Sequence, residues 1–261
     1  MKYYELGKEN QQTFLLLPGT CCTVKSNFSQ VIPFLAKEFH VIGVDYDGFD
    51  GKETEFTDMI TITQKIENFI QKQFHGKIDI AYGSSLGGSF VSLLIQRRNI
   101  HIDHAVIGSS DFDQNGKLSA WLKTQLVSAL MYPILKSGAM PDWMTSVMKK
   151  RHGEEAVEKS EKMISVISTG MKNVSKKTVK NQFYSDLITK IDDNISISET
   201  TVHIFYALQM GEQYRERYVQ HFWNPDVIEQ DYGHEELLFY HPEIWIKELH
   251  QHVIDRREGK V

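Results

Sequence analysis

The chain has 261 residues, of which 41% are hydrophobic and 24% are charged, a composition typical of a globular protein with a sizeable core. The formal net charge of −5 and the pI near 6.1 argue against nucleic acid as the main partner. No apolar run approaches the roughly 18 residues of a membrane span, and the N-terminus lacks the apolar segment of a secretory signal. We therefore expect no membrane span. The chain has only two cysteines, the adjacent Cys21 and Cys22, which rarely bridge each other, so we expect a cytoplasmic protein with reduced thiols.

The first third of the chain alternates between strand and helix patterns. We expect strands at residues 2–6, 13–17 and 39–44, and helices at 28–35, capped by Ser26, and 60–70, capped by Thr57. The run at 13–17 is apolar throughout, which is typical of a strand buried on both faces. Repeated strand–helix units with short connections predict an α/β fold, with a mostly parallel central sheet and helices on both of its faces.

The run at residues 78–89 reads as a buried strand that ends in Gly-x-Ser-x-Gly and continues as a helix. This is the pattern of a nucleophile elbow, with Ser85 at its tip. Glycines two residues before and after the serine let neighbouring backbone come close. The alternative for Ser85 is an ordinary helix N-cap. The apolar run before the motif, and the absence of proline from Gly83 to Gln96, favour the elbow. A strand at 103–108 follows.

Strand patterns are then missing from about residue 116 to 194. Amphipathic helices are expected at residues 118–135, 141–150, 154–167 and 176–191. Strand character returns at 201–208 and more weakly at 225–229, and Pro242 can start a closing helix with Trp245, Ile246, Leu249 and Val253 on its buried face. We therefore predict a core formed by 1–112 and 198–261, with 113–197 as a helical cap insertion.

A serine nucleophile requires a base, and the base requires a carboxylate that orients it. His234 follows Gly233 in the loop between the last strand and the closing helix, and is the expected base. Glu212, just past Gly211 after the preceding strand, is the expected acid. Asp111, after the strand next to the elbow, is the alternative acid, and Asp226 and Asp231 are more distant ones.

The order serine, acid, histidine, on this alternating pattern, resembles the α/β-hydrolase superfamily over nearly the whole chain. Residues 15–20 stand where that family has a strand followed by His-Gly, although Pro18 replaces the histidine. Residues 45–51 resemble its Asp-x-x-Gly-x-Gly loop with one extra residue. Glu212 departs from the commoner aspartate. The resemblance implies an oxyanion hole formed by the backbone N–H groups of Leu86 and Thr20.

These residues predict a serine hydrolase that acts on a small ester, thioester or related acyl substrate through a Ser85–His234–Glu212 triad and an acyl-enzyme. The alternatives are a non-catalytic ligand-binding member of the fold and C–C hydrolase or lyase chemistry on the same triad. We expect no cofactor and no metal, because neither His-Glu-x-x-His nor Cys-x-x-Cys spacing occurs. The expected partner is a small-molecule substrate, and the pattern does not specify the acyl chain or the oligomeric state.

Overall fold

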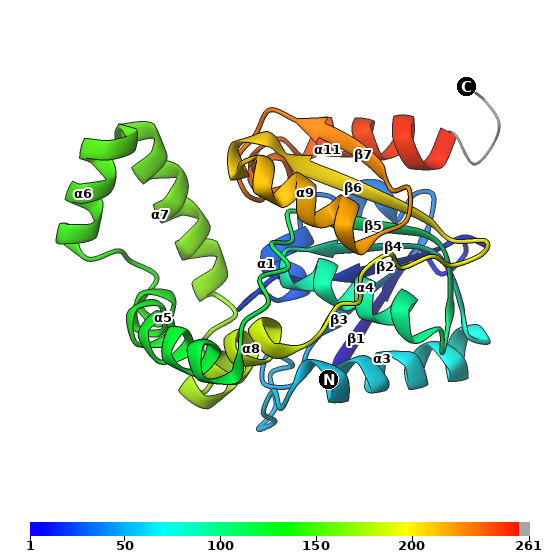
Figure 1. Cartoon of the computed structure of the whole chain (residues 1–261), viewed down its shortest axis with the longest axis horizontal. Helices are drawn as coiled ribbons and strands as arrows, with labels where there is room; N and C mark the ends of the chain where they lie inside the picture. The colour runs from blue at the N-terminus through cyan, green and yellow to red at the C-terminus, as the bar shows by residue number, and fades with distance from the viewer. Residues whose placement is uncertain (256–261) are drawn as a thin grey trace.

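The computed structural model of the protein describes residues 1–255 and contains a seven-stranded sheet in the order β1-β3-β2-β4-β5-β6-β7 (Figure 1). The strands are β1 (Lys2–Leu6), β2 (Thr13–Leu17), β3 (His40–Asp45), β4 (Lys77–Ser84), β5 (His101–Gly108), β6 (Thr201–Ala207) and β7 (Asp226–Gln230). Only β1 runs antiparallel to its neighbour, and all other pairs are parallel. The predicted α/β class and mostly parallel sheet are confirmed.

Helices cover both faces of the sheet, and the alternation along β2 shows why. Leu15 and Leu17 pack in one core with α3 (Met59–Phe74), α4 (Leu86–Arg97) and α9 (Glu212–His221). Phe14 and Leu16 point to the opposite core, which is closed by α1 (Val24–Phe28), α2 (Ile32–Leu35), α10 (Glu236–Tyr240) and α11 (Pro242–Leu249). These four apolar side chains of β2 are fully buried, as the apolar run predicts.

Two predicted helix caps are wrong by a few residues. Thr23 caps α1 by accepting the Ser26 N–H at 3.1 Å, so Ser26 is the third helical residue of a capping box. Asp58, and not Thr57, caps α3 by accepting the Thr61 N–H at 2.8 Å. The single helix expected at 28–35 is instead split into α1 and α2, because Pro33 lacks the N–H that a continuous helix would use.

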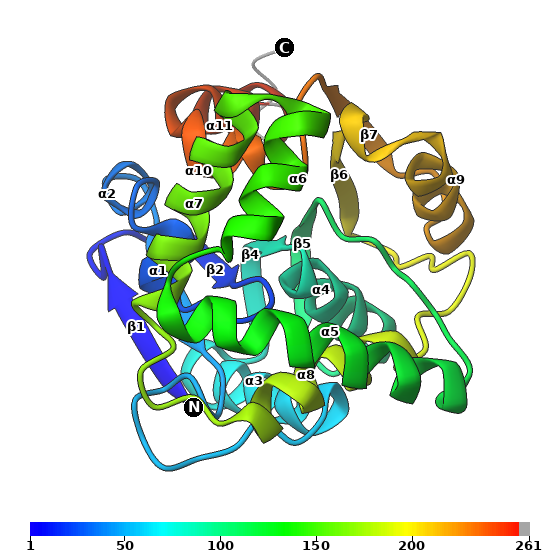
Figure 2. The same ribbon diagram turned by 90° about the vertical axis from the view of Figure 1, so that its left-hand side faces the viewer.

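Four helices lie between β5 and β6, as predicted for the insertion: α5 (Lys117–Ser137), α6 (Asp142–His152), α7 (Glu154–Ser168) and α8 (Lys176–Ile188). They lie on the side of the sheet where the parallel strands end, and α6 and α7 project away from the sheet (Figures 1 and 2). α8 ends before Ile191, which is still buried. The predicted limits at residues 112 and 197 fall in connecting segments, and residues 256–261 of the last predicted part lie outside the described residues.

The insertion leaves large apolar side chains on its surface. Leu118 and Leu126 on α5 are 73% and 74% exposed, and Trp143 on α6 is 58% exposed. Within residues 1–255, no helix combines the length and apolar character that crossing a membrane requires. The helices α5 and α6, both expected to be amphipathic, therefore bury only part of their apolar side chains against the rest of the protein.

The turn from β4 to α4 has no room for Cβ atoms at its glycines. A Cβ on Gly83 would stand 2.1 Å from the Gly87 carbonyl carbon, and one on Gly87 would stand 1.9 Å from the Leu17 carbonyl oxygen. Both obstacles are backbone atoms, which cannot move aside as a flexible side chain can. The spacing of the two glycines therefore allows α4 to start directly against β4 and the end of β2.

The substitution Gly87→Ala should destabilise the fold, because the added methyl group overlaps the backbone of β2. We expect a loss of about 1–3 kcal/mol in the free energy of unfolding, as for overpacked cores. Urea denaturation measures this loss. The matched control is Gly116→Ala, where the nearest atom to an added Cβ is 3.9 Å away and the expected change is below about 1 kcal/mol. Equal stability of the two variants would contradict the packing argument.

Candidate active site

Ser85 stands at the tip of the β4–α4 turn, where the sequence pattern predicts a nucleophile. Its backbone has φ 51° and ψ −114°, a conformation that non-glycine residues rarely adopt. Its N–H donates to the Gly108 carbonyl at 2.7 Å, and its own carbonyl accepts the Ser110 hydroxyl at 2.5 Å. The end of β5 therefore fixes the strained turn. The side chain is half-buried at the N-terminus of α4.

His234 lies in the loop after β7, at the same edge of the sheet as Ser85, because β4 and β7 point the same way. The residue is exposed to solvent. Protein atoms nevertheless surround the ring closely enough that desolvation lowers the pKa of His234 below 6.5, while the charge of Asp111 acts in the opposite direction. A neutral imidazole at neutral pH is the form that can accept a proton.

The two candidate acids differ in their relation to His234. Asp111 follows β5, is half-buried, and its negative charge acts on the pKa of His234. Glu212 is the first residue of α9, is exposed, and its charge acts on Tyr206. Within residues 1–255, no hydrogen bond joins His234 to Ser85 or to either carboxylate, and such contacts often tighten only when substrate is bound.

The loop after β2 carries Thr20, the residue whose N–H is expected to bind an oxyanion. Side chains hold the loop just before Thr20: Asn27 Oδ1 accepts the Gly19 N–H at 2.7 Å, and the Tyr46 hydroxyl donates to the Pro18 carbonyl at 3.0 Å. Leu86, the second expected donor, is the first residue of α4, where N–H groups have no acceptor within the helix. These bonds fix the loop without a histidine at position 18.

Glu235 is a site residue that the sequence reasoning missed. Its carboxylate accepts the Ser84 hydroxyl at 2.5 Å, and its side chain is buried. Ser84 precedes Ser85 and Glu235 follows His234, so this bond joins the neighbours of the two predicted catalytic side chains. Burial raises the pKa of Glu235 to about 7, and the hydrogen bond from Ser84 opposes the shift. No local pattern distinguishes such a glutamate from the half-buried Glu236 beside it.

The helical insertion contacts both loops that carry site residues. Lys159 on α7 pairs with Glu236 at 2.7 Å, and its carbonyl accepts the Tyr240 hydroxyl. On the other side, Gln182 on α8 accepts the Cys21 N–H at 2.9 Å, next to Thr20. The insertion is therefore anchored to the histidine loop and to the loop after β2.

The two cysteines are buried, and burial raises the pKa of Cys22 to about 12, so they are held as thiols. Cys21 is similarly shifted upward by burial. Among residues 1–255, no group of three or more His, Cys, Asp and Glu side chains is arranged to hold a metal ion.

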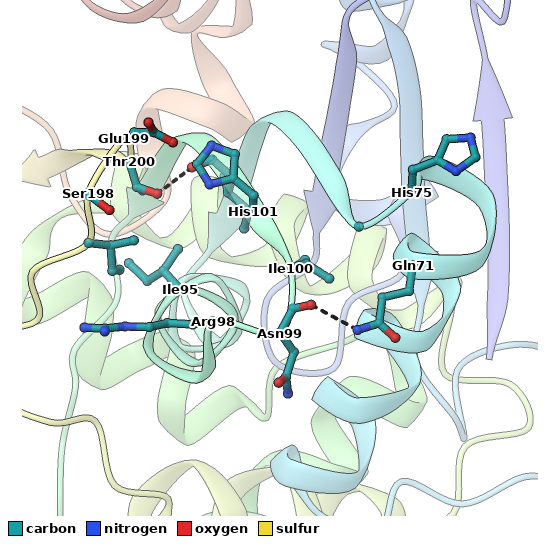
Figure 3. A pocket seen from close by; sticks show the side chains of 13 residues that line it. Gln71, His75, Ile95, Arg98, Asn99, Ile100, His101, Ser198, Glu199 and Thr200 are labelled. Carbon is teal, nitrogen blue, oxygen red and sulfur yellow. Dashed lines mark hydrogen bonds between the residues drawn. The ribbon is translucent and has the colours of Figure 1, made fainter.

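A hollow of about 660 Å³ lies at the opposite edge of the sheet (Figure 3). It is lined by His101, the first residue of β5, and by Arg98, Glu199 and Thr200. The Thr200 hydroxyl is already bonded to the Ile102 carbonyl at 2.8 Å. Because parallel strands begin here, none of the candidate catalytic residues reaches this hollow, despite its size. The candidate site is at the other edge.

No protein-family model matches the chain. A curated relative, the 1H-3-hydroxy-4-oxoquinoline 2,4-dioxygenase of Pseudomonas putida, is 34% identical over 95 residues. These residues make up 36% of this chain and 35% of that protein, so the match spans about a third of the relative's length.

Solved structures are similar over almost the whole chain. A protein described as an alpha/beta hydrolase family member from Desulfitobacterium hafniense has a TM-score of 0.78 and 14% identity, covering 96% of this chain and 99% of its own. A lipase-esterase related protein from Clostridium acetobutylicum has a TM-score of 0.66 and 16% identity, covering 97% and 99%. At these identities the likeness extends to the architecture and not to the substrate, and the chain therefore has the α/β-hydrolase fold.

Proposed function

We propose that the protein is a serine-dependent hydrolase of a small ester, thioester or related acyl substrate. The observation that carries this proposal is the strained backbone of Ser85 at the β4–α4 turn, with φ 51°, beside the loop that bears His234. A fold retained only for ligand binding would not need a serine held in a costly conformation. The esterase-related structural neighbour supports this chemistry for the fold.

The proposed reaction has two steps, acylation of Ser85 and hydrolysis of the acyl-enzyme. The Ser85 hydroxyl attacks the acyl carbon while His234 takes its proton, and the N–H groups of Leu86 and Thr20 stabilise the oxyanion. The imidazolium then gives this proton to the leaving alcohol or thiol. Water repeats the sequence on the acyl-enzyme, which releases the acid and restores the Ser85 hydroxyl.

Asp111 is the carboxylate that we assign to the imidazolium. Its charge acts on His234, whereas Glu212, the acid that the sequence pattern favours, is exposed at the start of α9. An acid after β5 instead of β6 also keeps the carboxylate next to the strand that carries Ser85. Glu212 remains the alternative, and the two acids can be separated by experiment.

The substitution Ser85→Ala should abolish hydrolysis of p-nitrophenyl acyl esters, because the neighbouring hydroxyls of Ser84 and Ser110 are already bonded to Glu235 and to the Ser85 carbonyl. Initial rates with a series of acyl chain lengths measure this and also report the preferred acyl group. Ser89, one turn further along α4 and buried, offers the matched control, and Ser89→Ala should keep the ester activity. A Ser85→Ala variant with wild-type rates would rule out the nucleophile.

The pH dependence of kcat/KM should identify the acid. In the wild type, activity should rise with pH through an apparent pKa below 6.5, since His234 must be neutral to act as the base. Asp111→Asn removes the charge that raises the pKa of His234, so the rise should move to lower pH and kcat should fall on the order of 100-fold or more. Glu212→Gln should leave both unchanged. The reverse pattern would assign Glu212.

Oxygenation of a hydroxylated quinolone is a second candidate, favoured by the 34% identity to a dioxygenase over 95 residues. An oxygen electrode with 1H-3-hydroxy-4-oxoquinoline tests it directly. The hydrolase proposal predicts no oxygen uptake above the rate without protein. Uptake that persists in Ser85→Ala, together with absent ester hydrolysis, would establish the oxygenase instead.

A further inference from the structure

Glu235 has no part in the proposed reaction, yet its carboxyl group is buried at the centre of the site. The residue is only 7% exposed. The charge of Glu235 acts on the side chains of Cys22, Tyr82 and Tyr218. Among residues 1–255, no lysine or arginine forms an ion pair with it. A buried carboxyl group without a cation is costly, so its presence here calls for a physical reason.

Two hydrogen bonds connect Glu235 to the backbone that bears the predicted catalytic groups. Its carboxylate accepts the Ser84 hydroxyl at 2.5 Å, and its N–H donates to the Ser109 hydroxyl at 3.2 Å. Ser84 is adjacent to Ser85, and Ser109 lies just before Asp111 at the end of β5. One residue thus ties the loop after β7 to the ends of β4 and β5.

The backbone of Glu235 is held in a strained conformation. It has φ 57° and ψ 4°, in the left-handed region that favours glycine. Ser109, its partner, has φ 48° and lies in the same region. The second carboxylate oxygen, Oε1, is buried with no hydrogen-bond partner among the described residues. A residue chosen only for packing would need neither a strained backbone nor an unpaired oxygen.

We propose that Glu235 is a positioning residue, which holds His234 opposite Ser85 through its hydrogen bond to Ser84. The expected effect on the reaction rate rests on the proposed function. The expected fixing of the loop after β7 rests only on the contacts described above. With the bond intact, the loop after β7 cannot move relative to the β4–α4 turn without breaking a buried contact. Without it, the imidazole is free to leave the serine, and a displacement of about 1 Å costs on the order of 100-fold in rate.

A double-mutant cycle on Glu235 and Ser84 tests the proposal. Glu235→Leu and Ser84→Ala should each lower kcat for a p-nitrophenyl ester about 10- to 100-fold with KM nearly unchanged. The double variant should lose no more than the worse single variant, because both changes break one bond. Glu235→Gln keeps an oxygen acceptor for Ser84 and should restore kcat to within about threefold. Glu229→Gln, at an exposed position of β7, is the matched control and should match wild type.

NMR titration of His234 provides a readout that does not depend on turnover. In the wild type its pKa should lie below 6.5, and in Glu235→Leu it should move back toward 6.5 as the ring leaves its desolvated position. Glu235→Gln should keep the low value, and His234→Ala identifies the signal. A purely structural role would change the unfolding midpoint and leave this pKa in place.

The outcomes separate the two proposals. If the wild type lacks hydrolase activity but the pKa of His234 moves as expected, the proposed function fails and the positioning role stands. If Glu235→Leu keeps both the wild-type kcat and the wild-type pKa of His234, or if the losses in the cycle add, the positioning role is overturned. Thermal unfolding of each variant confirms that a folded protein is being compared.

Discussion

The close contact between the β4–α4 turn and the end of β2 is the constraint on which the rest of the site depends. The Gly87 backbone lies against the Leu17 carbonyl, with no room for a Cβ, and Gly83 lies against Gly87 in the same way. This contact forces Ser85 into its unusual conformation and places the loop with Thr20 beside it. The bonds from Ser85 to Gly108 and Ser110 then link the turn to β5. The geometry of the candidate site therefore follows first from backbone packing.

Much of this could be predicted from the sequence, because the relevant signals are local. Apolar runs mark the strands, and the Gly-x-Ser-x-Gly spacing marks the turn at Ser85. The caps were misplaced because Thr23 and Ser26, or Thr57 and Asp58, are all acceptable cap residues, and only tertiary packing decides between them. The short helices α9 and α10 could not be predicted from the sequence, because tertiary contacts stabilise them and their apolar residues show no clear helical period.

Neither the choice of acid nor the contacts of Glu235 could be predicted from the sequence, for a different reason. Both depend on which loops meet across the edge of a parallel sheet, at separations such as the 151 residues between Ser84 and Glu235. Glu235 and Glu236 are adjacent residues of the same type. Glu235 is nevertheless buried against Ser84, whereas Glu236 pairs with Lys159 of the insertion. That difference also connects the insertion to the loop that bears His234.

Covalent labelling of Ser85 is the most direct test of the account. The wild-type protein is incubated with a fluorophosphonate at pH 7.5, and the modified peptide is mapped by mass spectrometry. We expect a single adduct on Ser85, whose rate of formation falls sharply in His234→Ala. Absence of an adduct, or an adduct on another serine such as Ser84 or Ser110, would contradict the claim that the strained turn carries an activated nucleophile.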